Sequence, residues 1–344
     1  MATQLVPSIS TTPPRTWRTP ERHLEAATDS PWYRLVSRLQ CAIVDATSSF
    51  YKERRIRPTL MPITVGSISS PIGLGSDSLP VRIDLLGGST YLADSMQFQL
   101  ELLLRQGFEG VYYIMPSFRG EEPDATHLNQ FFHSEAEIRG GLDEIMLLIE
   151  SYVRRLAVAT LAECEDDLVR ATGTTRHAED LAARSSFPRI RLRDALKLLG
   201  DTPEFFAAGP GDARSLTRRG EQALIRESGG VVWVTHFDPI TVPFYQALED
   251  DGEGARTADL LLGRGEAVGC GERHRTRAQV EAALKQHRVD PTEYEWYLRM
   301  KEHAPIRTAG FGLGLERFLL WLLRHDDARD LQVFPRIKGI RSWI

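Results

Sequence analysis

Cysteine is scarce in this sequence of 344 residues, in which only Cys41, Cys164 and Cys270 occur. Three widely separated cysteines fit neither a disulfide framework nor the ligand spacing of a structural zinc site. Free thiols are typical of reducing compartments, so we expect a cytoplasmic protein.

Long apolar runs and an excess of positive charge are also missing. The most apolar stretch, residues 318–323, is far shorter than the roughly 20 residues that span a bilayer, so we expect no membrane association. Lys and Arg number 42 and Asp and Glu 47, a net charge of −5. A protein that binds nucleic acid mainly through phosphates needs a basic excess, so that class is disfavoured. A local basic pocket for a nucleotide stays open.

The composition that is present, 42% hydrophobic and 26% charged residues, is that of an ordinary globular protein. Apolar periodicity predicts helices over residues 32–51, 91–106, 141–164, 192–199, 220–228, 280–286, 291–301 and 315–324. It predicts strands over residues 56–65, 111–118, 131–138, 231–235, 257–262 and 267–269. The first of these contains Pro58 and Pro62 and is expected at a sheet edge. Strands and helices without a βαβ repeat favour the α+β class, with an antiparallel β-sheet flanked by helices.

Composition also divides the chain into a tail and a single domain. Residues 1–30 include a Ser/Thr/Pro-rich run and are expected to be a disordered tail. Residues 31–344 are expected to form the domain, in which the polar, charge-rich residues 165–230 are a helical insertion. Residues 66–80 are rich in Gly, Ser and Pro and predict a loop.

A glycine-rich run precedes the last predicted helix. Residues 310–314 read Gly-Phe-Gly-Leu-Gly, and Leu-Glu-Arg follows at 315–317. Glycine lets backbone or a flat ligand approach closely, and Arg317, just inside the helix, can reach a phosphate or stack on a base. Tight packing of the helix on a sheet explains the same glycines, so this run alone leaves both interpretations open.

A denser pattern joins two predicted strands. It includes Arg119, Glu121, His127, Phe131 and Glu135, which a loop between the strands would direct towards one site. Arg119 suits a phosphate, and Phe131 offers a stacking surface for a base. The alternative is a charged hairpin that is simply exposed to solvent. We disfavour it because further segments of the sequence fit the same kind of site.

These segments resemble motifs of the class II aminoacyl-tRNA synthetases, in the aspartyl/asparaginyl group and most closely the asparaginyl enzymes. Residues 119–137 resemble motif 2 and residues 310–317 resemble motif 3. Pro62 resembles the motif 1 proline near the dimer interface, which implies a homodimer. Similar segments follow in the family's order at residues 91–97, 234–245, 259–260, 265–266, 273, 294–297 and 334–336. The resemblance covers residues 32–344 and implies that residues 31–344 are a class II catalytic domain.

The resemblance implies that the domain binds ATP. Arg119 would grip the α-phosphate and stabilise charge during adenylation, and His127 would contact the γ-phosphate. Phe131 and Arg317 would sandwich the adenine, next to Gly314.

It also implies the remaining catalytic and metal-binding groups. Glu121 would orient the nucleotide or the activated group, so Arg119, Glu121 and Arg317 are the catalytic candidates. Asp259 and Glu266 would hold Mg²⁺ on the phosphates, as hard oxygen ligands should.

An amino-acid site is implied as well. Its candidate substrate-binding residues are Ser95, Gln97, Glu101, Glu135 and Arg273. Arg273 would bind an acyl or amide oxygen of the side chain, and Gln97 and Glu135 would position the amino-acid end. Glu101 stands where asparaginyl enzymes have a glutamate facing the amide. A carboxylate there favours a hydrogen-bond donor such as an amide NH₂ or ammonia.

Several departures from the family pattern affect what we expect of the partners. The family's anticodon-binding domain is not found before residue 31, so tRNA is expected to be an unlikely partner. Ser70 replaces a glutamate that meets the substrate's α-amine, and Leu100 replaces a lysine that binds an aspartate side chain. The motif 2 loop is one residue short, and Thr126 and Gln130 replace an arginine and a glutamate in it.

Free-standing archaeal-type asparagine synthetases are also similar, and they lead to the first functional hypothesis. In it, an ATP-dependent ligase adenylates a carboxylate, Asp/Asn-like and free or within a modified amino acid or peptide. The acyl group then passes to ammonia or another amine, giving an amide, AMP and pyrophosphate. A related version activates an amide oxygen and forms a nitrile. Two further hypotheses are a truncated asparaginyl-tRNA synthetase or tRNA modifier, and a non-catalytic regulatory or scaffolding paralogue.

Overall fold

The computed structural model describes residues 11–70, 78–85, 87–341 and 344. Its α-helices are α1 (His23–Asp29), α2 (Pro31–Glu53), α3 (Gln97–Arg105), α4 (Leu142–Thr172), α5 (Arg176–Ala183), α6 (Leu192–Leu199), α7 (Arg218–Glu227), α8 (Arg277–His287), α9 (Glu295–His303) and α10 (Leu315–Leu322). Short 3₁₀ helices are η1 (Thr16–Arg18), η2 (Pro20–Arg22), η3 (Pro239–Thr241), η4 (Pro291–Tyr294) and η5 (Ala328–Leu331). The strands are β1 (Arg57–Pro58), β2 (Thr64–Val65), β3 (Val81–Leu85), β4 (Gly88–Leu92), β5 (Gly110–Phe118), β6 (Gln130–Arg139), β7 (Arg189–Arg191), β8 (Phe206–Ala208), β9 (Arg214–Leu216), β10 (Val231–Thr235), β11 (Thr257–Leu262), β12 (Gly265–Glu272) and β13 (Thr308–Gly314).

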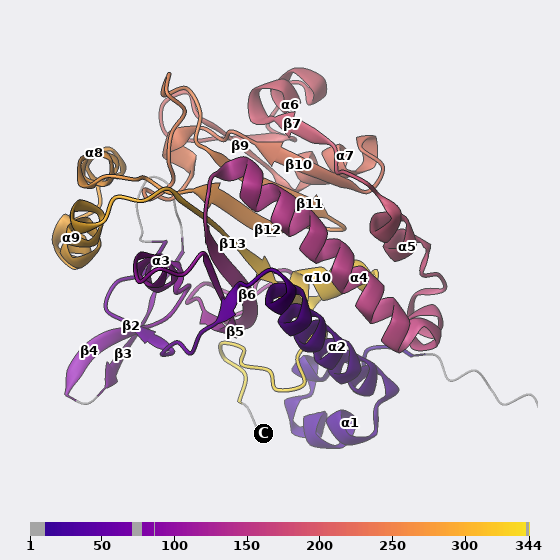
Figure 1. Ribbon diagram of the computed structural model, residues 1–344. Helices are drawn as coiled ribbons and strands as arrows, with labels where there is room; N and C mark the ends of the chain where they lie inside the picture. Colours follow the sequence, from indigo (N-terminus) through magenta and orange to yellow (C-terminus); the bar gives the residue numbers. More distant parts are fainter. Residues whose placement is uncertain (1–10, 71–77, 86, 342–343) are drawn as a thin grey trace, which may run out of the picture.

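One large sheet organises the domain. Its strands run in the order β1-β5-β6-β13-β12-β11-β10-β7, and β2-β4-β3 and β8-β9 form two smaller sheets (Figure 1). The inner pairs are antiparallel, and only the edge strands β1 and β7 pair in parallel with their neighbours. The predicted α+β class, with an antiparallel-rich sheet flanked by helices, is confirmed. The single strand predicted over residues 56–65 is instead two short ones: β1 lies at the edge of the large sheet, and β2 lies at the edge of the sheet β2-β4-β3.

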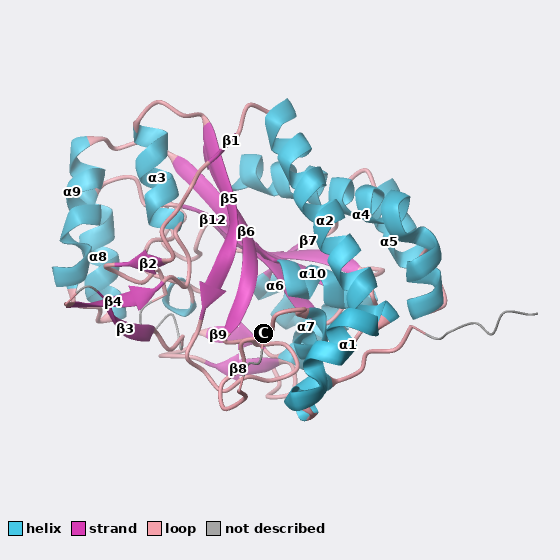
Figure 2. Ribbon diagram, turned by 90° about the horizontal axis from the view of Figure 1, so that it is seen from below, coloured by secondary structure: helices cyan, strands magenta, loops and turns pink. Residues whose placement is uncertain are grey.

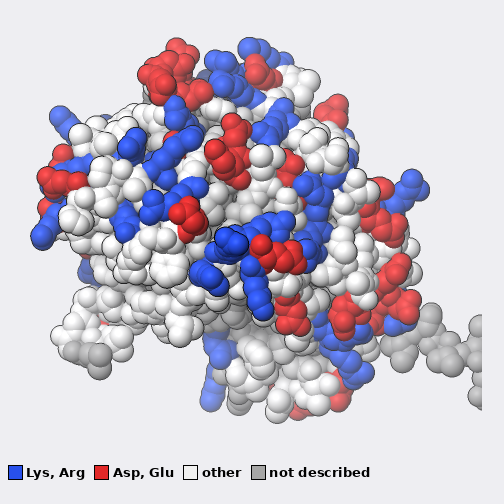
Figure 3. Space-filling view, in the orientation of Figure 1, with Lys and Arg blue, Asp and Glu red and all other residues white. Residues whose placement is uncertain are grey.

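Helices cover the two faces of this sheet differently. The helices α2 and α4 pack on one face, where Leu39, Ile149 and Tyr152 are fully buried with Phe311 of β13. On the other face, α6 and α7 pack against β10 and β11. The helices α3, α8 and α9 lie together at one side, away from α2, α4 and α5 (Figure 2). On the face that α2 and α4 cover, positive and negative side chains are interspersed, as on a solvated surface (Figure 3).

The alternation of side chains along each strand separates core residues from polar ones. In β13, Ala309, Phe311 and Leu313 belong to the core, so Gly310 and Gly312 face the opposite side. Gly310 pairs with Glu137 and Gly312 with Glu135 on β6. A Cβ on Gly310 would lie 1.2 Å from Glu137 Oε2, and one on Gly312 would lie 3.3 Å from Glu135 Oε1. These glycines therefore make room for two carboxylates.

The helix predicted over residues 91–106 begins only at Gln97. Residues 88–92 form β4, because Thr90 and Tyr91 pair with β3 in a hairpin that the periodicity does not reveal. The helix predicted over 141–164 continues to Thr172, past a kink where Cys164 leaves helical geometry. The predicted helical insertion also contains short strands, of which β7 joins the large sheet.

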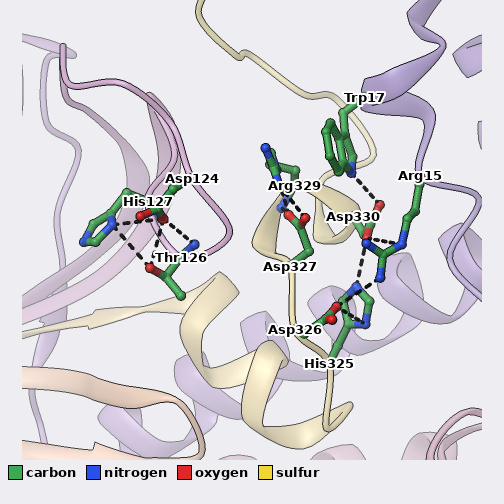
Figure 4. Close-up of polar contacts among 10 residues, drawn as sticks. All are labelled: Arg15, Trp17, Asp124, Thr126, His127, His325, Asp326, Asp327, Arg329 and Asp330. Atoms are coloured by element: carbon green, nitrogen blue, oxygen red, sulfur yellow. Dashed lines mark hydrogen bonds and ion pairs between the residues drawn. The ribbon is translucent and has the colours of Figure 1, made fainter. Parts of the chain in front are cut away.

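The predicted disordered tail does not hold for residues 11–30, which fold onto the C-terminal part of the chain. The Trp17 indole N–H donates to Asp330 Oδ1 at 3.1 Å, and the Arg329 guanidinium carbon lies 3.6 Å from the centre of the Trp17 ring (Figure 4). Aromatic anchors of this kind outweigh a composition rich in Ser, Thr and Pro. Residues 1–10 lie outside the described part of the chain.

The predicted loop over residues 66–80 is described only in part, since residues 71–77 lie outside the described chain. The backbone N–H groups of Ser69 and Ser70 both donate to the buried Asp94 carboxylate, at 3.1 and 2.9 Å. Asp94 therefore fixes the start of this loop. Across the described residues, no helix has the length and apolarity needed to cross a membrane.

A buried ion pair joins α3 to α9. The side chains of Glu101 and Lys301 are both fully buried and bind each other. Tyr297 donates to Glu101 Oε1 at 2.6 Å, and Lys301 donates to the carbonyl of His274 at 2.7 Å. Burial of an ion is tolerated only with such partners.

We predict that Lys301→Met destabilises the protein by about 3–5 kcal/mol, because it removes the nearest counter-charge of the buried Glu101 carboxylate and leaves it with Arg105 at 3.6 Å. Urea denaturation measures the change. The double variant Glu101→Gln/Lys301→Met should lose clearly less, and Lys285→Met, which changes an exposed side chain of α8, should change little. A single variant as stable as the double variant would contradict the prediction.

Candidate active site

A cavity of about 360 Å³ lies on the polar face of the large sheet; we call it the sheet cavity. The strands β6, β11, β12 and β13 form its floor, and α7 and the segment before α3 contribute to its walls. Of the predicted site residues, it brings together Ser95, Gln97, Arg119, Glu135, Asp259, Glu266 and Arg273. Their convergence follows from strand alternation, which turns the polar positions of neighbouring strands to the same face.

Asp259 and Glu266 form the acidic end of the sheet cavity. Asp259 pairs with Gly269 across the β11–β12 ladder. Both carboxylates lie near the point where a Cβ on Gly269 would stand, Glu266 Oε1 at 2.8 Å and Asp259 Oδ1 at 3.5 Å. Burial and the neighbouring Glu266 raise the pKa of Asp259 well above its ordinary value. Two carboxylates held this close favour a cation between them.

Glu135 is held by three donors in the centre of the cavity. Ser95 Oγ donates to its Oε2 at 2.6 Å, Tyr113 donates to the same oxygen, and His133 Nδ1 lies 3.0 Å from its Oε1. Burial alone raises the pKa of Glu135, but these bonds outweigh burial and lower it. The side chain therefore stays an anion, suited to a substrate ammonium group.

Arg273 forms the opposite, basic end of the cavity. Its Nε and Nη2 donate to the two oxygens of Glu137 at 2.7 and 3.2 Å, and its Nη1 donates to Gln246 Oε1 at 3.0 Å. Its guanidinium carbon lies 5.2 Å from the ring centre of Tyr245. Five N–H donors minus these three bonds leave two for a ligand.

The structure places Glu101 outside the cavity that holds the other predicted substrate residues. It faces Lys301, Tyr297 and Thr308 instead, and does not line the sheet cavity. Its position in the sequence gives no sign of this, because Lys301 lies 200 residues further along the chain.

A second cavity of about 290 Å³, which we call the loop cavity, lies under the loop between β5 and β6. It is lined by the predicted nucleotide residues Arg119, Glu121, His127, Phe131, Glu266, Gly314 and Arg317. The guanidinium carbon of Arg119 lies 5.6 Å from the centre of the Phe131 ring. Arg317 donates to the backbone oxygen of Glu266 at 2.8 Å and lies 3.2 Å from its Oε2.

The loop that covers this cavity is fixed by its own polar groups. Glu121 Oε1 accepts from the Leu79 amide at 3.1 Å, and Asn129 donates to the carbonyls of Arg119 and Glu121 at 3.1 and 2.7 Å. Asp124 Oδ1 accepts from the His127 amide at 2.8 Å and lies 3.1 Å from its Nδ1 (Figure 4).

A third cavity of about 250 Å³, the α7 cavity, connects the other two. It is lined by Thr126, His127, Arg218, Glu221, Leu262, Arg264, Gly265, Glu266, Arg317 and Leu320. Arg119 lines both the sheet cavity and the loop cavity, and Glu266 lines all three. The three cavities are therefore parts of one site.

Sequence reasoning missed several side chains of this site. Asp94, Gln246 and Glu221 line the sheet cavity, and Arg218 lines the α7 cavity. Asp94 directly precedes the predicted Ser95 and lies within the family-like segment 91–97, although the resemblance assigns no role to it. Nothing in the local pattern of the remaining three indicates the site, because the fold alone brings them there.

The residues present fit ATP and Mg²⁺ on physical grounds. The buried Nε of Arg119 has no hydrogen-bond partner among the described residues, so it is left for an anionic ligand. The paired carboxylates of Asp259 and Glu266 supply hard oxygen donors. Within the described residues, no three metal-binding side chains form a complete cage. Mg²⁺ is commonly held by one or two carboxylates together with substrate phosphates.

Comparison with known proteins agrees with this site. The family described as tRNA synthetases class II (D, K and N) matches residues 16–338. The asparagine–tRNA ligase of Thermoplasma acidophilum is 26% identical over 306 residues, which are 88% of this chain and 68% of that protein. That of Xylella fastidiosa strain 9a5c is 31% identical over 261 residues, 74% of this chain and 56% of that protein. For several of these relatives the chain spans less than two thirds of their length.

Solved structures with a similar fold are also asparaginyl-tRNA synthetases. The asparaginyl-tRNA synthetase of Pyrococcus horikoshii superposes with a TM-score of 0.82 at 24% identity, over 93% of this chain and 72% of that one. The Entamoeba histolytica enzyme gives a TM-score of 0.81 at 22% identity, over 95% and 72%.

These relatives correct one expectation. The prediction that tRNA is an unlikely partner is wrong, because the matching curated proteins are asparagine–tRNA ligases. The resemblance to the asparaginyl enzymes and the class II fold are confirmed. The match over nearly the whole chain, the topology and the converging motif residues lead to one conclusion. This chain belongs to the class II tRNA synthetases of the aspartate, lysine and asparagine group, a family of ATP-dependent ligases.

Proposed function

We propose that this chain uses ATP to activate the α-carboxylate of an asparagine-like amino acid, and transfers the acyl group to an acceptor. The observation that carries the proposal is the meeting of the cavities. Arg119 stands where the sheet cavity, suited to an amino acid, joins the loop cavity, suited to a nucleotide. A carboxylate in one cavity and an α-phosphate in the other would therefore meet beside the Arg119 guanidinium.

The first step follows from this placement. A carboxylate oxygen attacks the α-phosphorus, and the bond from that phosphorus to the β-phosphate oxygen breaks, giving an acyl-adenylate and pyrophosphate. Negative charge builds up on the α-phosphate oxygens, where the N–H groups of Arg119 stabilise it without rearrangement. Phe131 and Arg317 line the space for the base, and His127 lies on the side of the α7 cavity.

Asp259 and Glu266 are the residues that would hold Mg²⁺, which when bound neutralises phosphate charge. The raised pKa of Asp259 supports this role, because an anion beside Glu266 is stabilised by a cation.

The basic end of the sheet cavity supports a neutral side chain on the substrate. Glu137 neutralises Arg273, so this end carries little net charge while two N–H donors remain. A side-chain amide oxygen suits such donors, whereas a second carboxylate would need further positive charge. Leu100, fully buried, supplies none. The Pyrococcus horikoshii relative is described in complex with asparaginyl-adenylate, which agrees with this assignment.

The acceptor closes the reaction when its nucleophile attacks the acyl carbon and AMP leaves. We propose tRNA as the first acceptor, because the curated relatives are asparagine–tRNA ligases. Ammonia or a small amine is the second candidate. The observation in its favour is the excess of carboxylates in the sheet cavity, where Asp94, Glu135, Glu221, Asp259 and Glu266 face two arginines. Such an excess attracts an ammonium group.

A nitrile-forming reaction and a non-catalytic role find less support. Glu101 lies outside the sheet cavity, so it does not favour activation of an amide oxygen to form a nitrile. A non-catalytic role leaves unexplained why the phosphate, metal and substrate candidates share one connected site.

Our first functional prediction concerns activation. Pyrophosphate exchange into ATP should depend on asparagine and magnesium, and Arg119→Ala should lower its rate by about 10²–10³-fold, since a donor to the developing charge is lost. Arg176→Ala, which removes only an exposed arginine paired with Asp180, is the matched control. Wild-type protein without exchange on asparagine, aspartate or related carboxylates would overturn the proposed function.

The second functional prediction concerns the part of the sheet cavity that would bind the side chain of the substrate. The paired change Arg273→Gln/Glu137→Gln removes both buried charges together, so no ion is left without its partner. We expect the KM for asparagine to rise about tenfold or more while the KM for ATP stays within twofold. Exchange kinetics measure both constants. An equal rise in the two KM values would contradict the assignment of Arg273.

The third functional prediction distinguishes tRNA from ammonia as the acceptor of the acyl group. Radiolabelled asparagine should become acid-precipitable on total tRNA, with AMP formed in equal amount. In a parallel reaction, ammonium replaces tRNA, and asparagine, aspartate and related carboxylates are offered as substrates. Mass spectrometry follows the formation of amides. Charging in the first reaction supports tRNA. Amide and AMP in the second without charging in the first supports the amine.

A further inference from the structure

The first turn of α7 connects two sides of the α7 cavity. The helix start is fixed by Thr217, whose side chain accepts from the Gly220 amide at 3.1 Å and donates to the Glu204 carbonyl at 2.5 Å. From this turn, Arg218 points to the β5–β6 loop. Glu221, one turn later, lies against the start of β12, where a Cβ on Gly265 would stand 2.3 Å from its Oε2.

Arg218 binds the part of the loop that carries His127. Its Nη2 donates to Thr126 Oγ1 at 2.6 Å and lies 3.6 Å from Asp124 Oδ2. Asp124 in turn receives the amides of Thr126 and His127 at 2.6 and 2.8 Å and lies 3.1 Å from His127 Nδ1 (Figure 4). Because Asp124 occupies Nδ1, Nε2 is the ring nitrogen that remains for a ligand.

The opposite side of the loop is anchored separately. The Ala328 amide of η5 donates to the Ala125 carbonyl at 2.8 Å. Two contacts fix the 3₁₀ helix η5 itself (Figure 4). Arg329 Nε donates to the Asp327 carboxylate at 2.8 Å, and Asp330 accepts from the Trp17 indole N–H. The loop is therefore clamped between η5 and α7, and Arg218 supplies the clamp on the α7 side.

We propose that Arg218 is a positioning residue for the terminal phosphates of the nucleotide. It fixes the Asp124–His127 turn, and this turn presents His127 to the α7 cavity. Besides the carboxylates of Glu221 and Glu266, the cavity contains the cationic side chains of Arg264 and Arg317, a mixture that suits a polyphosphate carrying a metal ion. The inference rests on the proposed function and adds to it a residue from the insertion, outside every motif that the sequence pattern revealed.

Calorimetry with two nucleotides tests this role without depending on turnover. ATP with magnesium reports contacts to all three phosphates, whereas AMP lacks the β- and γ-phosphates. We expect Arg218→Ala to weaken ATP about fivefold, as for an exposed charged contact, and to leave AMP within experimental error. Arg218→Lys should recover part of the loss. Arg219→Ala, which removes the neighbouring exposed arginine paired with Glu204, should change neither.

A second background shows whether Arg218 acts through His127. If it does, the variants His127→Ala and His127→Ala/Arg218→Ala bind ATP equally, because the positioned group is already absent. A full additional loss in the double variant, equal losses for ATP and AMP, or an unchanged affinity of Arg218→Ala for ATP would each overturn the inference. Intact ATP binding with no pyrophosphate exchange would instead reject the proposed function. Wild-type protein that binds no ATP would reject both.

Discussion

The buried carboxylates Glu135 and Glu137 on the polar face of the large sheet are possible because each has both a partner and room. Glu137 binds Arg273, and Glu135 receives three donors. Both carboxylates stand opposite glycines of β13, and any larger residue at Gly310 would overlap Glu137. An unpaired buried ion would cost several kcal/mol. The glycines of β13 therefore determine whether the neighbouring strand can hold two buried carboxylates. The rest of the site depends on this arrangement.

The sequence is most informative where local pattern and strand alternation agree. The strands at residues 231–235 and 257–262 and the helix at 192–199 have the predicted bounds. The loop between β5 and β6 collects Arg119, Glu121, His127 and Phe131 at one cavity, as the hairpin pattern implies. The glycine-rich run has a physical meaning that neither interpretation of its sequence included. Gly310 and Gly312 accommodate carboxylates of the neighbouring strand, and Gly312 also lines the sheet cavity and the loop cavity.

Contacts between distant segments are beyond the reach of sequence pattern. The resemblance to the asparaginyl enzymes assigns Glu101 to the substrate, whereas its orientation is set by Lys301 on another helix. The roles of Arg218 and Glu221 could not be predicted from the sequence for the same reason. Both residues reach the site only because α7 packs across β11 and β12. The ordered residues 11–30 depend on Trp17 meeting Arg329, a pairing that composition cannot show.

The pairing of Arg317 with Glu266 connects a residue that we propose for the base with one that we propose for the metal. Arg317 donates to both the backbone and the carboxylate of Glu266, and both residues line the loop cavity and the α7 cavity. A guanidinium stacks through its flat face and donates hydrogen bonds in its plane, so Arg317 can stack on a base while it still holds the Glu266 carboxylate. In the proposed function, a base on Arg317 and a cation on Glu266 would therefore order the same pair of side chains, and each ligand would favour the other. The acidic excess of the sheet cavity acts in the same direction, because polyphosphate without a cation would meet several carboxylates there. In the proposed function, the site therefore suits a nucleotide that arrives together with its metal.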